Sequence, residues 1–490
     1  MTSNQPLDED VTIARMRDVL KRQQVASMTE GPPSTALRID RIDRVIQLLL
    51  ENQQRLCRAL ASDFSWRSHD QSLMSDVLLS VAGFKYARKH LRKWMKPQRR
   101  SPEMGAGLLG AKAEIYFQPL GSIGIMVPWN FPVAIALGPL AEALAAGNRA
   151  MIMLSEFTPA TAALLIELLA GVFDETEVAA FVGGAKVGAA FSGLPLDHIV
   201  FTGSPRVGKL VMAAAAENLT PLTLELGGKS PTIIGRGADL DNAARRIWGG
   251  KVVNSGQACI APDYVLVHED DREHLLTSMQ TELQRMFPTL RCNLDYTAIA
   301  SQRQYDRLQR YLQDAEALGV RRIEVNPAHE DLGAVRKIAP TLLVDPPEQA
   351  LVMQEELFGP LLPICSYRTI DEAIAYINAR PRPLALYYFG DDRVEARKVL
   401  RHTWSGGVCI NEVMQHIFQS DLPFGGCGNS GFGRYRGGEG FKAFSLQRSV
   451  FKPAWFDVMG LLRPPYGSLL RRVMGALLKA PAKKQQRSRA

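Results

Sequence analysis

The sequence predicts an α/β protein with two parallel-sheet domains, and three observations support this. Its 490 residues, 46% hydrophobic and 22% charged, are enough for two or three globular domains with sizeable cores. From residue 133 onward, short apolar stretches alternate with stretches at helical spacing, which favours a parallel sheet covered by helices on both faces. This alternation fills one unit before residue 226 and a second unit over 226–420.

The part of the chain before residue 133 is predicted to form two scaffold helices and a β-hairpin. Apolar residues recur at close to helical spacing over 38–60 and again over 73–96, so both segments are expected to be amphipathic surface helices. Prolines and glycines make 97–112 an irregular crossing. Strands over 113–118 and 122–127, joined by a Pro-Leu-Gly turn, are then expected to pair as a hairpin.

The first α/β unit places two polar side chains at the end of a strand. A helix is expected over 133–146 and a short apolar strand over 149–154. The next helix is expected to begin near Thr158, with the threonine as its cap and a proline in its first turn. Ser155 and Glu156 therefore stand at the carboxyl end of a strand, where open α/β sheets bind their ligands. A solvated loop acid is the plain alternative for Glu156.

A strand, a glycine turn and a helix follow later in the same unit. The strand is expected over 196–201 and the helix over 209–217, with Gly203, Ser204 and Gly208 between them. Free N–H groups in the first turn of such a helix can bind a pyrophosphate. The spacing G-x-x-x-x-G departs from the common dinucleotide fingerprint, so the pattern alone leaves an ordinary strand–turn–helix open.

The second α/β unit contains the most reactive candidate side chain. Asp239 is expected to cap a helix over 240–247, and further helices are expected around 270–286 and 301–318. A glycine-dense loop over 423–433 precedes a closing strand over 434–450. Between the first two helices lies Cys259, which is preceded by small and polar residues in a setting where a thiol can stay accessible to a substrate. A buried, inert cysteine is the alternative.

Two distant motifs supply partners for this thiol. Glu225 lies behind an apolar run and ahead of a Gly-Gly pair, where a strand gives way to a loop that permits close approach. Asn130 lies between two prolines that stiffen a turn and fix the direction of its amide. A nucleophile, a base and a neutral hydrogen-bond donor are the groups required for acyl transfer through a thioester.

Composition limits the compartment and the kinds of partner that we expect for the protein. The six cysteines show no close pair and no metal-ligand spacing, so we expect a reducing, cytoplasmic compartment and no metal site. The polar, acidic start does not resemble a secretory signal, and no window offers the roughly 18 apolar residues of a membrane span. The whole net charge of +8 resides in 458–490, which argues against a nucleic-acid-binding fold.

The basic C-terminal segment is expected to contain an amphipathic helix. Six apolar residues recur at helical spacing between Leu469 and Leu478, while Arg471 and Arg472 lie largely off that stripe and Pro481 is expected to end the helix. Such a helix can lie on an anionic membrane surface as a peripheral contact. It can equally pack on the protein's own dimer, and the sequence leaves both readings open.

Five separated motifs, in this order, resemble the aldehyde dehydrogenase family over roughly residues 35–450. They are PWNFP (128–132), FTGS (201–204), LELGGKSP (224–231), NSGQAC (254–259) and EELFGP (355–360). Details around 155–159, 261–265 and 463–466 are similar to the branch that contains coniferyl aldehyde and fatty aldehyde dehydrogenases. The structural alternative for the aromatic residues of these motifs is plain core packing.

The resemblance implies a fold, a domain order and a set of roles. It implies a Rossmann-like cofactor domain over 1–225, a catalytic domain over 226–433 and a dimer-building β-arm over 97–127 and 434–452, followed by the tail over 453–490. Cys259 is then the nucleophile, Glu225 the general base and Asn130 the oxyanion donor. The residues implied to bind NAD are Trp129, Ser155, Glu156, Gly203, Ser204, Gly208, Glu356 and Phe358.

One position departs from the family pattern. A lysine that bonds the adenosine ribose normally precedes the cofactor glutamate, but Met153 stands in its place here. Loss of that donor is expected to weaken NAD binding by about 1.5–3 kcal/mol if no neighbour compensates. It also removes a cation that could accept a 2′-phosphate, while Glu156 would repel one, so NADP is disfavoured.

The resulting prediction is an NAD-dependent dehydrogenase that oxidises an aldehyde to the carboxylic acid through a cysteine thioester. A bulky aromatic aldehyde such as coniferyl aldehyde is favoured, with a long-chain fatty aldehyde as the alternative and a homodimer as the expected assembly. CoA-acylating or phosphate-dependent relatives would have replaced Glu225, and a silent binding paralogue would have lost Cys259 or Asn130. These alternatives are therefore less favoured.

Overall fold

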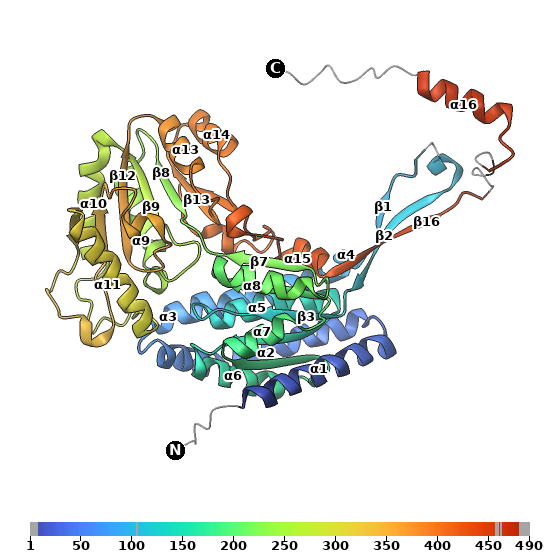
Figure 1. Cartoon of the computed structure of the whole chain (residues 1–490), viewed down its shortest axis with the longest axis horizontal. Coiled ribbons are helices and arrows are strands. Elements are labelled where there is room, and N and C mark those ends of the chain that lie inside the picture. Colours follow the sequence, from blue (N-terminus) through green and yellow to red (C-terminus); the bar gives the residue numbers. More distant parts are fainter. Residues whose placement is uncertain (1–7, 104–105, 456–459, 461–462, 480–490) are drawn as a thin grey trace. The chain divides into compact units, whose positions relative to one another are not determined.

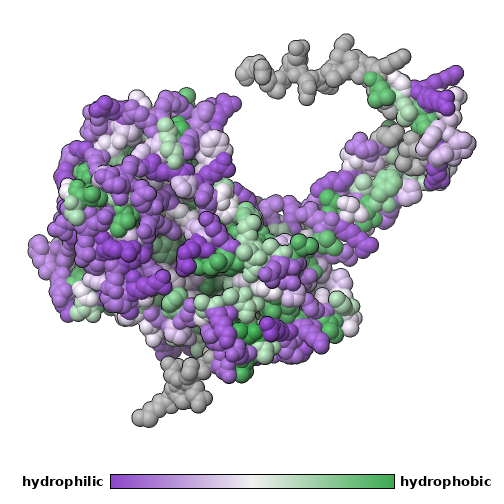
Figure 2. All heavy atoms as spheres, viewed as in Figure 1, coloured by the Kyte–Doolittle hydropathy of each residue, from purple (hydrophilic) through white to green (hydrophobic). Residues whose placement is uncertain are grey.

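The computed structural model describes residues 8–103, 106–455, 460 and 463–479 (Figure 1). The chain separates into two compact units. We call Met1–Trp94 with Pro119–Ser445 the body, and Met95–Gln118 with Leu446–Ala490 the arm. Figure 2 shows that hydrophilic side chains cover most of the visible face of the body, while hydrophobic ones occur in small groups.

The first sheet of the body has six strands in the order β15-β7-β6-β3-β4-β5. Every pair is parallel except β15 with β7. The side chains of the central strands are buried almost throughout, which explains their nearly continuous apolar sequence. The strands are β3 (Ser122–Met126), β4 (Arg149–Ser155), β5 (Val178–Gly183), β6 (His198–Gly203), β7 (Leu222–Leu226) and β15 (Gly431–Phe432).

Helices cover both faces of this sheet. On one face, α1 (Glu9–Glu30), α7 (Ala185–Ser192) and α8 (Pro205–Ala216) share an apolar cluster with the strands. On the other, α5 (Pro132–Ala146) and α6 (Pro159–Ala170) contact β3, β4 and β5, and α2 (Thr35–Asp63) packs on both helices. Helix α3 (His69–Ser72), the π-helical turn η1 (Leu73–Leu78) and α4 (Leu79–Trp94) follow α2.

Strand order places a ligand crevice at the centre of the first sheet. The chain proceeds from β3 outward through β4 and β5, then returns to β6 on the other side of β3. Adjacent parallel strands whose connections leave in opposite directions open a crevice at their carboxyl ends. The segment that contains Asn130 follows β3, and Ser204 follows β6, so both predicted motifs lie at this point.

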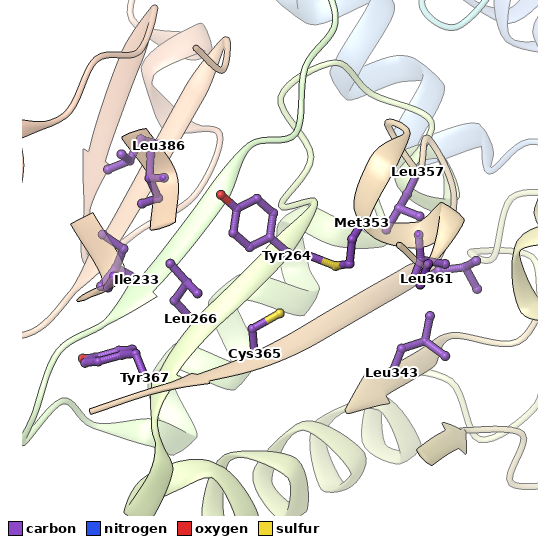
Figure 3. Close-up of a cluster of buried hydrophobic side chains, with 14 of the residues drawn as sticks. Ile233, Tyr264, Leu266, Leu343, Met353, Leu357, Leu361, Cys365, Tyr367 and Leu386 are labelled. Atoms are coloured by element: carbon purple, nitrogen blue, oxygen red, sulfur yellow. The ribbon is translucent and has the colours of Figure 1, made fainter. Parts of the chain in front are cut away.

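The second sheet has seven strands in the order β10-β11-β12-β9-β8-β13-β14, parallel except for β10. Figure 3 shows Tyr264, Leu266, Cys365 and Leu361 converging in its apolar core. Helices α11, α12, α13 and α14 contribute to that core, and α9 packs against α10. The strands are β8 (Pro231–Ile234), β9 (Tyr264–His268), β10 (Arg321–Glu324), β11 (Thr341–Val344), β12 (Leu361–Tyr367), β13 (Ala385–Phe389) and β14 (Gly407–Ile410). The helices are α9 (Leu240–Lys251), α10 (Arg272–Met286), α11 (Gln302–Ala317), α12 (Leu351–Gln354), α13 (Ile370–Asn378) and α14 (Arg393–His402).

The predicted hairpin is wrong. Strand β3 does not pair with β2 (Lys112–Pro119) but lies between β4 and β6 in the first sheet. Its five side chains are all buried, as in a central parallel strand, and the Asp197 carboxylate accepts a 2.7 Å hydrogen bond from the Ser122 N–H. Residues 119–127 and 434–445, predicted as parts of the arm, therefore belong to the body.

The predicted closing strand over 434–450 is also corrected. Its first half contains helix α15 (Gly437–Ala443), and β16 begins only at Ser445 and ends at Lys452. In the arm, β2 lies between β1 (Gln98–Arg100) and β16 in a three-stranded sheet. Strand β15 returns residues 431–432 to the first sheet, although they were expected in the catalytic domain.

The helical prediction for the tail is confirmed as α16 (Ser468–Lys479). Leu470 is buried, whereas Leu469, Met474 and Leu478 are exposed. Pro481 lies outside the described residues, as do the side chains of Val473 and Leu477. Within the described ranges, no helix is both long enough and apolar enough to cross a membrane.

Candidate active site

A strained loop holds Cys259 immediately before β9. Asn254, Ser255 and Gly256 all adopt left-handed backbone conformations, with φ of 50°, 51° and 76°. A Cβ at Gly256 would overlap the carbonyl oxygen of Gly359, so only glycine fits this close approach. Strain of this kind persists only where the surroundings fix it, and it concentrates at functional sites.

The polar residues of the loop form its internal framework. Asn254, Ser255 and Gln257 are fully buried, while the Cys259 thiol itself stays accessible from the cavities, as predicted. The Asn254 amide donates to the Asn130 carbonyl at 3.0 Å. The Gln257 amide donates to the carbonyls of Asn254 and Ala298 at 2.9 and 3.1 Å. Their hydrogen bonds fix the loop and thereby the direction of the Cys259 side chain.

The Cys259 thiol is half-buried and lies where two cavities meet. Burial raises the pKa of the thiol to about 12, and the carboxylates of Glu356 and Glu225 add to the rise. The backbone N–H groups of Cys259 and Ile260 oppose it. The sulfur is therefore a protonated thiol at neutral pH and becomes nucleophilic only when a base or a nearby positive charge favours the thiolate.

Glu225 faces the same space from β7. It pairs in register with Thr202 of β6 and with Gly431 of β15, and its side chain is buried with both carboxylate oxygens lacking a partner among the described residues. Burial raises the pKa of this carboxyl well above its usual value, against the opposing charges of Arg434 and Arg436. A buried carboxyl with free oxygens and a raised pKa is suited to accept a proton from water near neutral pH.

Asn130 is held by a buried ion pair that was not predicted. Its amide donates to the Gln257 carbonyl at 3.1 Å, and its own carbonyl accepts from Arg67 at 2.8 Å. Arg67 pairs with Asp76 at 2.7 Å, and neither side chain has any exposed surface. The Asp76 carboxylate also accepts hydrogen bonds from the first N–H groups of α5. The pair thus fixes the turn on which Asn130 stands.

Eight of the eleven predicted site residues line one cavity between the two sheets. Trp129 and Phe358 meet edge to face there, with ring centroids 5.4 Å apart, and Phe358 has a left-handed φ of 48°. The eight are Trp129, Asn130, Gly203, Ser204, Glu225, Cys259, Glu356 and Phe358. The cavity thus joins the catalytic candidates to most of the cofactor candidates.

Glu356 approaches the backbone after β7. A Cβ at Gly227 would overlap its carboxylate, which explains the first glycine of the Gly-Gly pair. Burial, followed by the nearby Asp263, raises the pKa of Glu356 to about 8. Arg307 donates to the carbonyls of Glu356 and Leu357 at 3.0 and 2.7 Å and so holds this loop at the cavity.

The helix that follows the glycine turn begins earlier than predicted. Helix α8 starts at Pro205, not at 209, and the Ser204 hydroxyl caps it by accepting from the Val207 N–H at 3.4 Å. Gly208 therefore lies inside the helix, where a Cβ would be 2.8 Å from Leu226. It allows α8 to pack closely on β7, and the helix start still faces the cavity through Ser204.

Ser155 and Glu156 stand at the carboxyl end of β4, as predicted, but outside the cavity lining. Thr158 occupies the predicted cap position of α6 without making a side-chain cap bond. The Asp63 carboxylate caps that helix instead, by accepting from the N–H groups of Ala160 and Thr161 at 2.9 and 2.8 Å. Met153 is buried beside Phe181 in the apolar cluster under α1 and α7.

A second, apolar chamber lies on the other side of Cys259 and Glu225. Thr202, Cys259 and Glu225 line both spaces. The chamber walls carry aromatic and aliphatic side chains, among them Phe131, Ile135, Met414, Ile417, Phe418 and Phe424. A thiol, a carboxyl and a hydroxyl thus stand between a mixed polar cavity and an aromatic one.

The family model for aldehyde dehydrogenases matches residues 22–450. The chain belongs to the aldehyde dehydrogenase family. A Caulobacter vibrioides member named a probable coniferyl aldehyde dehydrogenase is 50% identical, over 96% of this chain and 99% of that protein. A Pseudomonas coniferyl aldehyde dehydrogenase is 48% identical, over 95% and 96%. A substrate-bound structure of Staphylococcus aureus AldH is 33% identical, with a TM-score of 0.89 over 95% and 99%.

As an aldehyde dehydrogenase, the chain oxidises aldehydes with a nicotinamide dinucleotide as the electron acceptor. The two α/β domains predicted from sequence are those of the family. The lining of the polar cavity fits the chemistry of such a cofactor, because buried acids, a capped helix start and an aromatic pair meet there.

Several residues of this aldehyde dehydrogenase site were missed from the sequence. Gln304 and Arg307 reach the polar cavity from α11, and Tyr435 and Arg436 reach the apolar chamber from beside α15. None of them stands in a motif with a recognisable spacing, and only the fold brings them to the site. Arg67 is likewise linked to Asn130 only through the tertiary structure.

A groove of about 760 Å³ elsewhere in the body does not belong to this site. Its lining includes Trp66, Cys292 and Arg336 but neither Cys259 nor Glu225. The candidate active site is assigned by its chemistry and not by the size of the hollow.

Proposed function

We propose that the protein oxidises a bulky aromatic aldehyde to its carboxylic acid with NAD, through a thioester on Cys259. One observation carries this proposal. Cys259 and Glu225 stand at the junction of a polar cavity that suits a dinucleotide and an apolar chamber that suits the aldehyde. A substrate carbon and a nicotinamide ring can therefore reach the same sulfur from opposite sides.

In this mechanism the Cys259 thiol releases its proton to solvent, and the resulting thiolate attacks the aldehyde carbon to form a tetrahedral adduct. The Asn130 amide and the Cys259 backbone N–H stabilise its oxyanion, and each such donor contributes about 3 kcal/mol. NAD supplies the acceptor for the hydride that leaves this carbon, and a thioester remains on Cys259. Glu225 then takes a proton from a water molecule as that water attacks the thioester, and the acid leaves with the thiol restored.

The preference for NAD over NADP rests on the adenosine end. Glu156 follows β4, where its carboxylate can accept from ribose hydroxyls and would repel a 2′-phosphate. Met153 contributes no cation there, because its side chain is uncharged, and it packs into the apolar cluster instead. Ser155, Gly203 and Ser204 are assigned to the phosphate and ribose region, which Gly208 supports from inside α8 by close packing on β7. Glu356, Phe358 and Trp129 are assigned to the nicotinamide end.

The substrate class is inferred from the chamber and from the relatives. Mostly aromatic and aliphatic side chains surround the space next to Cys259, which favours a large apolar group on the aldehyde. The relatives named for coniferyl aldehyde cover nearly the whole chain at 48–50% identity. A panel of aromatic and long-chain aldehydes tests this, and equal kcat/KM for acetaldehyde and coniferyl aldehyde would contradict the preference.

Two variants test the catalytic assignment. Cys259→Ala should abolish turnover while NAD still binds, as measured by calorimetric titration. Glu225→Gln should release one equivalent of NADH in a rapid burst, because hydride transfer precedes the step that needs the base. Loss of the burst together with turnover would show that Glu225 acts earlier, on the thiol itself.

The assembly and location are also proposed. The arm provides a three-stranded sheet that suits a homodimer contact. All six cysteines are free thiols, which suits a reducing cytoplasm.

Exposed Arg471 and Arg472 beside Leu469 on α16 suit a peripheral contact with an anionic membrane. Sedimentation with anionic vesicles tests the tail, and equal recovery of the full chain and of a version ending at residue 456 in the supernatant would exclude that contact.

A further inference from the structure

Arg436 is partly buried and has no ion-pair partner among the described residues. It lines the apolar chamber, and its Nη1 is buried without a hydrogen-bond partner. Among the described residues, no carboxylate lies within 4.0 Å of its guanidinium. An unpaired guanidinium nitrogen is costly where it is shielded from water, because nothing compensates its charge there. The guanidinium therefore has donor capacity that the protein itself does not use.

The backbone at Arg436 is strained in a way that fixes this side chain. Its φ of 89° lies in the region that non-glycine residues rarely adopt. On one side, Tyr435 exchanges backbone hydrogen bonds with Phe424 at 2.9 and 3.0 Å. On the other, the Gly437 N–H donates to the buried Glu142 carboxylate at 3.0 Å. The surroundings thus hold Arg436 in a costly conformation, which is typical of a functional position.

Two carboxyl groups lie near Arg436 without pairing with it. Glu225 shares the chamber, and Glu142 shares a small adjoining hollow that Arg436 also lines. The Oε2 atom of Glu142 and both oxygens of Glu225 also lack partners. Arg436 thus separates the reacting groups from a second buried acid, and its free N–H groups remain available to a ligand in the chamber.

We propose that Arg436 is a specificity residue that donates a hydrogen bond to an oxygen atom on the body of the substrate. This inference rests on the proposed function, because it assumes that the aldehyde occupies the apolar chamber. The preferred substrates are aromatic aldehydes with a hydroxyl, methoxyl or carboxylate oxygen on the ring. The corresponding aldehyde without that oxygen would leave the guanidinium buried and unpaired, and a site of this kind rejects such analogues.

The test compares coniferyl aldehyde with cinnamaldehyde, which has the same skeleton without ring oxygens. The wild-type protein should prefer coniferyl aldehyde in kcat/KM by at least about tenfold, as a charge-assisted hydrogen bond requires. Arg436→Met should remove most of this preference by lowering kcat/KM for coniferyl aldehyde, with cinnamaldehyde changed less than about threefold. Arg436→Lys should retain an intermediate preference.

Arg434→Met is the matched control. Arg434 also lies close enough to affect the Glu225 charge, but it is exposed, donates to the Gly406 carbonyl and does not line the chamber. Replacing a residue that acted only through Glu225 would change kcat/KM by the same factor for both aldehydes. Arg434→Met should show that pattern. An equal loss for both aldehydes in Arg436→Met overturns the proposal.

The wild-type protein alone also tests the proposal, without any variant. If the unaltered protein oxidises coniferyl aldehyde and cinnamaldehyde with equal kcat/KM, Arg436 does not select an oxygen and the proposal is overturned, while aldehyde oxidation itself stands. If neither aldehyde yields NADH but a small aliphatic aldehyde does, the proposed substrate class fails instead.

Discussion

Replacing Arg67 with methionine is expected to destabilise the body by about 3–5 kcal/mol, because it leaves the Asp76 carboxylate buried without its ion-pair partner. The same change removes the 2.8 Å hydrogen bond to the Asn130 carbonyl. It also removes the cation–π contacts of the guanidinium, which lies 4.9 Å from the ring centroids of both Phe64 and Phe131. The turn that holds Asn130 should then loosen.

Thermal unfolding measures this cost. Unfolding entropy of about 2.1 cal/mol/K per residue gives about 1 kcal/mol/K for a chain of 490 residues unfolding as one unit, so the melting temperature should fall by about 3–5 °C. The double variant Arg67→Met with Asp76→Asn should recover part of that loss, since no unpaired charge remains.

Arg55→Met provides the comparison for this variant. Arg55 pairs with Glu167 on the surface, where both side chains are about half exposed, and such pairs contribute about 0–1 kcal/mol. Its melting temperature should change by less than about 1 °C. If Arg67→Met melts within 1 °C of the wild-type protein and keeps its kcat, the ion pair has neither the energetic nor the positioning role inferred here.

Three further changes test other parts of the structure. Met153→Lys should tighten NAD binding about tenfold in a calorimetric titration while lowering the melting temperature without NAD, because the new ammonium must leave the apolar cluster; unchanged affinity would contradict this. Burial raises the pKa of Glu142 from 4.5 to about 7, so its neutral form adds stability that is complete below about pH 4.5 and lost as the pH rises through 7. Glu142→Gln should therefore be more stable than wild type by about 3 kcal/mol at pH 8 and equal to it at pH 4, and equal melting temperatures at pH 8 would refute this assignment. Gly256→Ala should lower kcat about 100-fold, because its Cβ would displace the loop of Cys259.

Local sequence patterns predicted those parts of the fold whose signals lie within a few residues. Helix α5 and strand β4 lie within one residue of their predicted bounds, and Asp239 caps α9 as expected. The hairpin failed because strand β3 and strand β2 are close in sequence but join different sheets, and a turn signal between two strands does not reveal their partners. The same limit affected β16, whose predicted first half is a helix.

The same contrast between local signals and tertiary contacts holds for the candidate site. Cys259, Glu225 and Asn130 were found because each stands in a motif of its own, and they meet at one cavity. Arg67 and Arg436 had no local signal, since a lone arginine in sequence is ordinarily a solvated surface residue. Only tertiary packing brings them to the site, so the ion pair behind Asn130 and the unpaired guanidinium in the chamber could not be predicted.

The wall between the two cavities has a practical consequence for changing the enzyme's substrate range. Thr202, Glu225 and Cys259 face both spaces, so a substitution at Thr202 would disturb cofactor and aldehyde together. Met414 and Phe424 face only the chamber. Libraries that vary these two positions can enlarge or reshape the aldehyde pocket while NAD affinity stays constant, which makes them the better starting points for engineering.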